Sequence, residues 1–263
     1  MIYKFFGVNH NLFDTLINNQ LFFSSIRQFN DPYDCRMFTI DKITEEDFRS
    51  YLDNLELSNE LNEKYLVSFR RNPEELTKPF IELYDNWLNY LGICCFTKEK
   101  NNTLLWSHYT GSHRGVCLGF DYELMTKTFT QFDEVDYNDD PFPFNIKEAS
   151  KSIRGTILRK SKDWSYEKEI RFLSERSKSK DFPQDALVEV NFGSRCTKRD
   201  MLNIQHLVLK LNYRKCNFYK ARINDKMYKI EFAECDYKEL KKDVLNDSAD
   251  IRFKQEIDLK HLL

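Results

Sequence analysis

The sequence predicts an α+β fold, in which a mixed or antiparallel β-sheet core carries a helical insertion at about residues 44–91. Three observations lead to this prediction. Short apolar runs bounded by turn residues, typical of strands, occur before residue 44 and after residue 91. Between those positions the apolar spacing changes to three and four residues, which is the helical period. Aromatic residues make up 15% of the chain, so a sizeable core can form without disulfides.

The first forty residues contain two predicted strands around a short helix. Residues 2–8 have the pattern of a strand, and the polar residues 9–11 can cap a helix over residues 12–19. The second strand, residues 21–25, is followed by the segment Asn30, Asp31, Pro32, Tyr33 and Asp34. This segment is a strong turn signal, because Asn and Asp side chains bond to nearby backbone groups and proline fixes φ.

The predicted insertion contains three helices. Thr44 and the acidic residues 45–47 form a capping pattern for the first helix. A second helix is predicted over residues 60–70, and a third begins at Pro73.

Strand patterns return after the insertion. A basic helix is predicted over residues 147–160, and a short one within residues 194–204. The predicted strands are residues 92–97, 115–121, 169–174, 187–192, 206–211, 218–223 and 227–232, the last two forming a hairpin over Asn224 and Asp225. We predict one domain over residues 1–237, followed by a charged helix or tail over residues 238–263.

Composition excludes several classes of protein. The net charge is −2, which gives no global reason to bind nucleic acid or an anionic membrane, although residues 147–162 could form a local basic face. The seven cysteines show no paired CxxC spacing, so neither a disulfide framework nor a metal site is predicted. The apolar runs are too short for a signal segment or a membrane span. We therefore expect a cytoplasmic protein with reduced thiols and no membrane partner.

The densest polar cluster surrounds a helix or turn that precedes a predicted buried strand. Two of the five histidines and three of the seven glycines fall within residues 103–121. The candidate functional side chains are Trp106, Ser107, His108, Tyr109 and Arg114. The alternative is structural, with Trp106 and Tyr109 packing in the core and His108 serving as a satisfied buried histidine.

A second cluster lies on the predicted strand that contains Glu167, Glu169 and Arg171. Side chains alternate on a strand, so these three should share one face, while Ile170 and Phe172 point toward the core. A carboxylate held by a neighbouring arginine could orient a ribose hydroxyl or stabilise an oxocarbenium ion. A solvated ladder of salt bridges is the structural alternative. We expect the chemistry where this face meets the cluster of residues 106–109.

A third cluster combines Tyr3 and Lys4 on the first strand with Asn30 and Asp31 after the second. Turn formation alone could explain Asn30 and Asp31, and Lys4 could lie on a solvated edge. The chain has no Walker loop, GxGxxG, nucleophile elbow or HExxH motif.

Taken in order, these segments resemble a bacterial domain-of-unknown-function family, number 2971. The resemblance rests on Tyr3-Lys4-Phe5, the turn at residues 30–34, the segment at residues 106–120 and the Glu-x-Glu-x-Arg strand at residues 167–171. It spans about residues 3–232. The order of these motifs is in turn similar to the three-part site of ADP-ribosyltransferases. Relatives often occur near antiphage and toxin genes, which implies a role in defence.

The resemblance to ADP-ribosyltransferases implies roles for particular residues. The early position, which holds the nicotinamide ribose, falls on Tyr3 or Lys4, where a lysine could also bind phosphate. The middle position falls on His108 or Tyr109. The late carboxylate that bonds to the ribose 2′-hydroxyl falls on Glu167 or Glu169. The remaining predicted binding residues are Asn30, Asp31, Trp106, Ser107, Arg114 and Arg171.

Three functions remain open at this point. The leading hypothesis is an NAD-consuming enzyme, either a transferase with a protein or nucleic-acid acceptor or a glycohydrolase. The second is a nucleotide- or nucleic-acid-binding module without turnover, in which Lys4, Arg114 and Arg171 contact anions. The third is a metal-dependent nuclease that uses Asp31 or Asp34 with the two glutamates.

Overall fold

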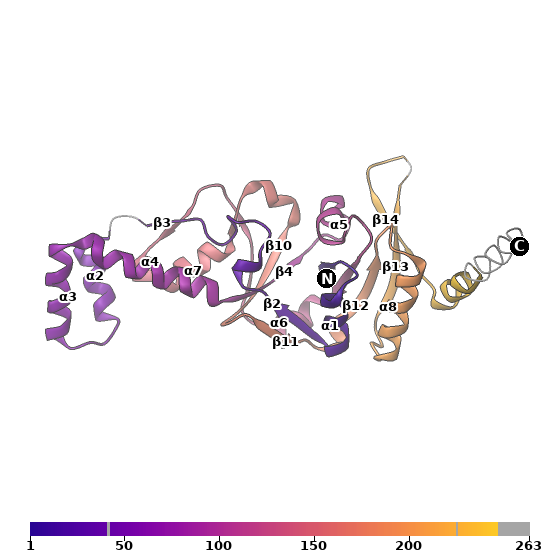
Figure 1. The fold of residues 1–263 in the computed structure, drawn as a ribbon, viewed down its shortest axis with the longest axis horizontal. Helices are drawn as coiled ribbons and strands as arrows, with labels where there is room; N and C mark the ends of the chain where they lie inside the picture. Colours follow the sequence, from indigo (N-terminus) through magenta and orange to yellow (C-terminus); the bar gives the residue numbers. More distant parts are fainter. Residues whose placement is uncertain (41–42, 225, 247–263) are drawn as a thin grey trace, which may run out of the picture. The chain divides into compact units, whose positions relative to one another are not determined.

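The computed structural model describes residues 1–40, 43–224 and 226–246, and it divides into two compact units. The first unit comprises Met1–Leu21, Phe96–Thr130 and Lys180–Leu263, of which the last stretch is described to residue 246. The second comprises Phe22–Cys95 and Gln131–Ser179. Three of the divisions between the two units fall within strands β2 (Gln20–Phe23), β4 (Gly92–Thr97) and β11 (Lys178–Asp181). These strands are labelled in Figure 1.

The first unit is built on a mixed, mostly antiparallel sheet. Its strands are β1 (Ile2–Phe6), β5 (Val116–Phe120), β12 (Leu187–Phe192), β13 (Asn217–Ile223) and β14 (Ile230–Glu234). Together with β4 they follow the order β14-β13-β12-β5-β1-β4, in which β12 and β13 are parallel and the other neighbours are antiparallel. All five residues of β5 are buried, as expected for a central strand with both faces covered.

Among its described residues, the first unit contains four α-helices between and beside its strands, and residues 237–246, at the start of the predicted C-terminal helix or tail, are also helical. The four helices are α1 (His10–Asn18), α5 (Thr103–Tyr109), α6 (Tyr122–Thr128) and α8 (Lys198–Lys210). The Asn9 side chain caps α1 by accepting from the Leu12 N–H, and Asn19 ends it in the left-handed conformation. Helix α8 connects the parallel strands β12 and β13, a link that requires a crossover, and Figure 1 shows it beside β13.

The second unit contains short strands and most of the helical residues. Strand β10 (Glu169–Ser174) pairs with β6 (Phe132–Glu134), and the order β4-β10-β6 holds within this unit. Two parallel pairs accompany it, β3 (Phe38–Ile40) with β8 (Phe142–Phe144) and β7 (Asp136–Tyr137) with β9 (Arg159–Lys160).

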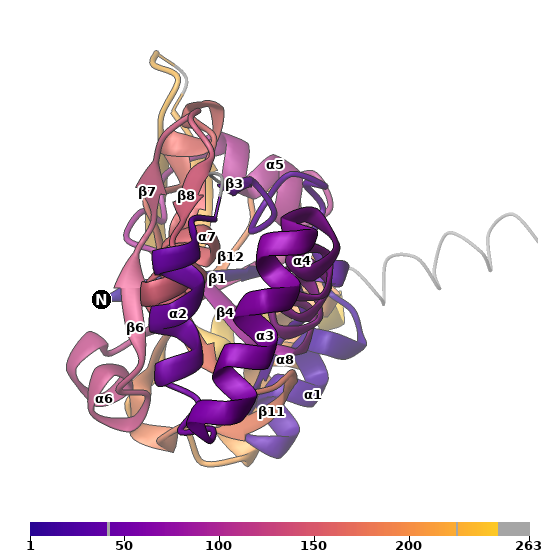
Figure 2. The same ribbon diagram turned by 90° about the vertical axis from the view of Figure 1, so that its left-hand side faces the viewer.

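The predicted insertion is helical, as the structure confirms. Its helices are α2 (Glu45–Asp53), α3 (Asn59–Arg71) and α4 (Pro73–Tyr90), shown together in Figure 2. Thr44 and Asp47 form the capping box that begins α2. Tyr84 and Leu88 of α4 pack against Ile157 of α7 (Ala149–Leu158), and the Tyr84 hydroxyl lies 2.6 Å from the Thr156 hydroxyl.

Several predicted elements need correction. The predicted strand at residues 206–211 is wrong, because α8 runs through it and buries Met201, Ile204, Gln205 and Val208 at helical spacing. The first strand ends at Phe6 and the last begins at Ile230. Lys4 is not on an edge, since β1 lies between β4 and β5. Asp225 of the predicted hairpin turn and residues 247–263 of the predicted tail lie outside the described residues.

Candidate functional site

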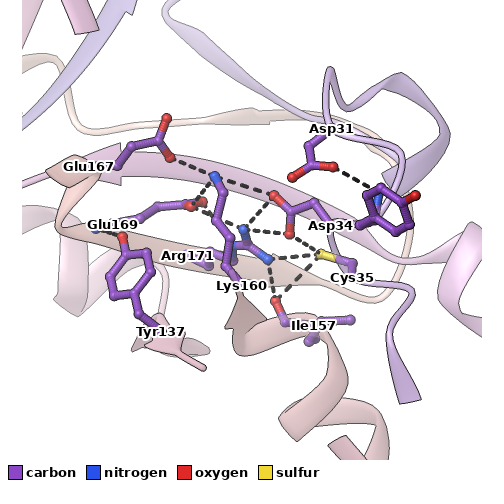
Figure 3. A network of polar contacts seen from close by, with 10 residues as sticks. Asp31, Asp34, Cys35, Tyr137, Ile157, Lys160, Glu167, Glu169 and Arg171 are labelled. Atoms are coloured by element: carbon purple, nitrogen blue, oxygen red, sulfur yellow. Dashed lines mark hydrogen bonds and ion pairs between the residues drawn. The ribbon is translucent and has the colours of Figure 1, made fainter. Parts of the chain in front are cut away.

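The second unit contains a buried network of charged side chains drawn from three segments (Figure 3). Asp34 and Cys35 come from the turn after β2, Lys160 ends β9, and Arg171 lies on β10. The turn forms as predicted, with the Asp31 carboxylate accepting from the Tyr33 N–H at 2.9 Å. Its next bend places Cys35 in the left-handed region at φ 61°. These bends direct Asp34 into the interior, where it is 5% exposed.

Arg171 is the organising residue of this network. It is 0% exposed, and its Nη2 donates to both Asp34 oxygens at 2.8 and 2.9 Å. Its Nε donates to Glu169 Oε1 at 2.8 Å, and Nη2 also reaches Glu169 Oε2 at 3.0 Å. Nη1 donates to the Ile157 carbonyl at 2.6 Å and lies 2.8 Å from the Cys35 sulfur. A planar guanidinium suits this role, because it offers several donors in fixed directions.

Lys160 is the second buried cation that contacts these carboxylates. Its Nζ donates to Glu167 Oε2 at 2.6 Å and to Glu169 Oε2 at 3.1 Å, and it lies 3.4 Å from Asp34 Oδ2. The same Nζ lies 5.0 Å from the centre of the Trp164 ring, within the range of a cation–π contact. Three buried carboxylates therefore surround two buried cations.

Burial and charge act in opposite directions on these groups. Burial raises the pKa of Glu169, but the charges of Arg171 and Lys160 outweigh that effect and lower it to about 2. Burial lowers the pKa of Lys160, but Glu169, Asp34 and Glu167 raise it above its ordinary value of 10.5. Burial raises the pKa of the Cys35 thiol well above 9.0, so Cys35 stays protonated at neutral pH. Lys160 is accordingly a fixed cation and Glu169 a fixed anion.

A pocket of about 570 Å³ opens beside the network. Asp34 and Lys160 belong to both the pocket lining and the network, while Tyr33 and Trp164 supply aromatic walls. The other lining residues are Asn30, Asp31, Pro32, Met37, Asn138, Asp139, Asp140, Arg159, Ser161 and Asp163. All of them belong to the second unit. The volume lies within the range of about 300–1,000 Å³ that is typical of small-molecule sites.

The structure brings Glu167, Glu169 and Arg171 together, but not by the predicted strand alternation. Strand β10 begins at Glu169, whereas Glu167 ends a 3-10 helix (Lys162–Glu167), and Lys168 between them is left-handed at φ 44°. Ile170 is buried as predicted, yet Glu169 and Arg171 are buried too, so the interpretation as a solvated ladder is wrong. Lys160 does not belong to a basic surface either, because it is 7% exposed.

The predicted residues of the α5 segment lie in the first unit. Trp106 is fully buried beside Tyr3, Cys117, Ala221 and Ile230, and its indole N–H donates to the Lys100 carbonyl at 2.7 Å. The structural alternative therefore holds for Trp106, but not for His108, which is exposed and not a buried histidine. The neighbouring side chains His108 and Arg114 are exposed, Tyr109 is half-buried, and Arg114 donates to the Gly111 carbonyl at 3.2 Å.

The histidine that pairs with Ser107 is His113, which the sequence did not single out. Ser107 Oγ lies 3.2 Å from His113 Nε2, and the His113 ring stacks on Trp106 with an interplanar angle of 12°. Burial and the charge of Arg195 lower the pKa of His113, so its ring is neutral at pH 7. The backbone at His113 is left-handed, with φ 68°.

Tyr3 belongs to a second charged cluster that sequence reasoning missed. The Lys100 Nζ lies 5.5, 5.1 and 4.9 Å from the ring centres of Tyr3, Tyr219 and Phe232, and 2.7 Å from the Glu189 carboxylate. Burial and the charge of Glu189 raise the pKa of Tyr3 to about 12. The polar residues at alternate positions of the apolar strand Leu187–Phe192 were the available signal.

Lys4 lies on the same strand as Tyr3 but has other partners. Its Nζ is 5.8 Å from the ring centre of Phe6 and 5.5 Å from that of Phe96. The predicted site residues thus fall into two groups, one in each unit. Tyr3, Lys4 and the α5 segment belong to the first. Residues 30–34 and 167–171 belong to the second.

Comparison with known proteins gives one match. Residues 105–172 match the model of a family described as a protein of unknown function (DUF2971). This segment is similar to the DUF2971 family. The match includes the Trp106–Phe120 motif and the Glu167–Arg171 motif, whereas the Tyr3 and Asn30–Asp34 segments lie outside it. Neither a curated protein nor a solved structure matches the chain.

Two further observations concern classes of function considered from the sequence. Among the described residues, no three or more His, Cys, Asp or Glu side chains are grouped so that they could hold a metal ion. Asp34, Glu167 and Glu169, which the nuclease hypothesis would use, are each paired with a buried cation. In the part of the chain that the structure describes, no helix has the length and apolar character needed to cross a bilayer.

Proposed function

We propose that the chain is an NAD-consuming enzyme, of the ADP-ribosyltransferase or NAD glycohydrolase type, whose substrate binds in the pocket of the second unit. The observation that supports this proposal best is one pocket lined by the Trp164 ring and by the Asp34 carboxylate that Arg171 fixes. An aromatic wall can stack on a nicotinamide ring. A carboxylate whose position is already set can act on the ribose without further reorganisation.

The chemistry required is cleavage of the glycosidic bond between nicotinamide and ribose. As that bond breaks, its electron pair goes to the nicotinamide nitrogen, and positive charge develops on the ribose C1′ atom. Water or the nucleophile of an acceptor then bonds to C1′ and loses a proton to solvent. A neighbouring carboxylate stabilises that charge, most effectively where water is excluded. On this proposal Asp34 provides the carboxylate. Glu167 and Glu169 fix Lys160 beneath the pocket, a different role from the catalytic one expected from the sequence.

The test is nicotinamide release from NAD by the purified chain, measured with and without cell extract as a source of acceptor. Trp164→Ala should reduce release by about tenfold or more, the equivalent of about 1.4 kcal/mol of lost contact. Trp87→Ala is the matched control, because Trp87 is 55% exposed on α4 and lines no part of this pocket. No nicotinamide release under either condition contradicts the proposal.

A second candidate is a nucleotide-binding module without turnover. It is favoured by the Asp34 carboxylate of the pocket lining, because both of its oxygens already accept hydrogen bonds from Arg171 Nη2. On this alternative Asp34 holds the shape and charge of the pocket wall and does not act on the ribose. Stabilisation of the chain by NAD in a thermal-shift measurement, without any nicotinamide release, would favour this alternative.

A further inference from the structure

We infer that the pocket of the second unit selects a flat organic cation, so that the nicotinamide end of NAD enters it and the adenylate end does not. This inference rests on the proposed function and adds the chemical class of the group that is recognised. Three observations support it, namely the charge of the lining, the charge of the network behind it and the character of the walls.

The lining is acidic. Five of its residues are aspartates, against two cations. Both cations have carboxylate partners, while among the aspartates Asp34 pairs with Lys160 and Arg171 and Asp139 pairs with Lys162. The Arg159 guanidinium donates to Asp136 at 3.1 and 2.7 Å, and Lys160 contacts the three buried carboxylates. A phosphate entering this pocket would therefore meet negative charge, while a cation would be attracted.

The network behind the pocket has the same sign. Its buried charged side chains are three carboxylates and two cations, which leaves one more negative charge than positive. Asp34 carries part of this charge to the pocket surface. Charge buried in protein is weakly screened, so a cation at the pocket wall gains more from it than a surface ion pair would. A ligand with one positive charge would balance the network.

The walls favour a planar group. Tyr33 is 67% exposed and Met37 is 43% exposed, and the pocket lining also includes the ring of Trp164. The Lys160 Nζ lies 5.0 Å from the centre of that ring, within the range of a cation–π contact. Aromatic faces attract cations by about 0.5–2 kcal/mol and also stack on planar ligands. Pyridinium, the charged ring of oxidised nicotinamide, combines both properties.

The experiment compares three probes by titration calorimetry on the full chain at matched ionic strength. They are 1-methylnicotinamide, which is cationic, nicotinamide, which has the same ring without the charge, and AMP. We expect 1-methylnicotinamide to bind about tenfold or more tightly than nicotinamide, and AMP not to compete with it. Asp31→Asn and Asp163→Asn should each reduce the preference several-fold. Asp53→Asn, an exposed aspartate at the end of α2, should leave it unchanged.

The outcomes separate this inference from the proposed function. A preference for the cation without nicotinamide release from NAD supports the inference and contradicts the enzymatic proposal. Nicotinamide release without any preference for the cation supports the enzymatic proposal and contradicts the inference. Equal affinity for the two nicotinamide probes, or displacement of 1-methylnicotinamide by AMP, overturns the inference. A preference that survives in both aspartate variants also overturns it, because the charge would then come from elsewhere.

Discussion

Replacing Arg171 with methionine is the sharpest test of the buried network. Methionine keeps much of the length and packing of the side chain but removes the charge and all the donors. Asp34 would lose two hydrogen bonds, of 2.8 and 2.9 Å, and Glu169 would lose two, of 2.8 and 3.0 Å. Three carboxylates would then share the single cation of Lys160. Removing one partner of a buried ion pair costs about 3–5 kcal/mol, and we expect Arg171→Met to fall in that range.

The measurement is urea denaturation, with the loss of stability taken from the shift of the midpoint. Arg49→Met is the matched control, because the Arg49 side chain is 46% exposed and its pairs with Glu45 and Glu63 lie at the surface. Exposed pairs contribute less than about 1 kcal/mol. Arg171→Lys should fall between the two, since it keeps the charge but loses the planar fork. If Arg171→Met shifted the midpoint no further than Arg49→Met, the Arg171 guanidinium would not be needed to compensate the buried carboxylates.

Three further predictions concern acid stability, backbone packing and the cluster of the first unit. The pKa of Glu169 is lowered from 4.5 to about 2, so its contribution to stability is present above pH 4.5 and is lost as pH falls toward 2. In urea denaturation across that range, Glu169→Gln should reduce the dependence of the unfolding free energy on pH. A Cβ atom at Gly115 would lie 2.0 Å from the Phe6 carbonyl oxygen, so Gly115→Ala should destabilise the chain by about 1–3 kcal/mol. In the control Gly7→Ala the new Cβ would meet only the Asn9 side chain, at 3.3 Å, and the cost should be less than about 1 kcal/mol. Lys100→Met removes an ammonium group from three aromatic rings and should lower the midpoint by the equivalent of about 1–2 kcal/mol; an unchanged midpoint would contradict that contribution.

Local signals allowed part of the fold to be predicted. The cap at Asn9, the capping box at Thr44 and the turn at Asp31 each depend on residues two to four positions apart, and each is present in the structure. Strand β10 has the predicted bounds for a similar reason, because its apolar residues alternate. The apolar residues within 206–211 fit the period of a strand as well as that of a helix, which led to the error there. The residues that α8 buries follow the helical period, namely Met201, Ile204, Gln205 and Val208.

The candidate site was harder to predict, because its members are brought together by tertiary structure. Arg171 and Asp34 are 137 residues apart, and nothing in the local sequence of either indicates the other. Lys160 lies at the end of a segment whose other lysines and arginines favoured a basic surface, and only the fold buries it. Glu167 was placed correctly near Arg171 but for the wrong reason, since the left-handed Lys168 reverses the expected alternation. The local sequence pattern indicates neither the burial of Lys160 nor the left-handed backbone at Lys168.

Stability alone does not explain why a chain would bury five charged groups together. Moving ions out of water is costly, and well-packed apolar residues in their place are often as stabilising or more so. The network instead provides fixed geometry, because Arg171 holds the Asp34 carboxylate with two bonds and the glutamates hold Lys160. Asp34 and Lys160 are also the two members that reach the pocket. The desolvation cost therefore fixes the positions of two pocket-lining charges, as a binding or catalytic site requires. This is the physical argument for the proposal that the substrate binds in the second unit.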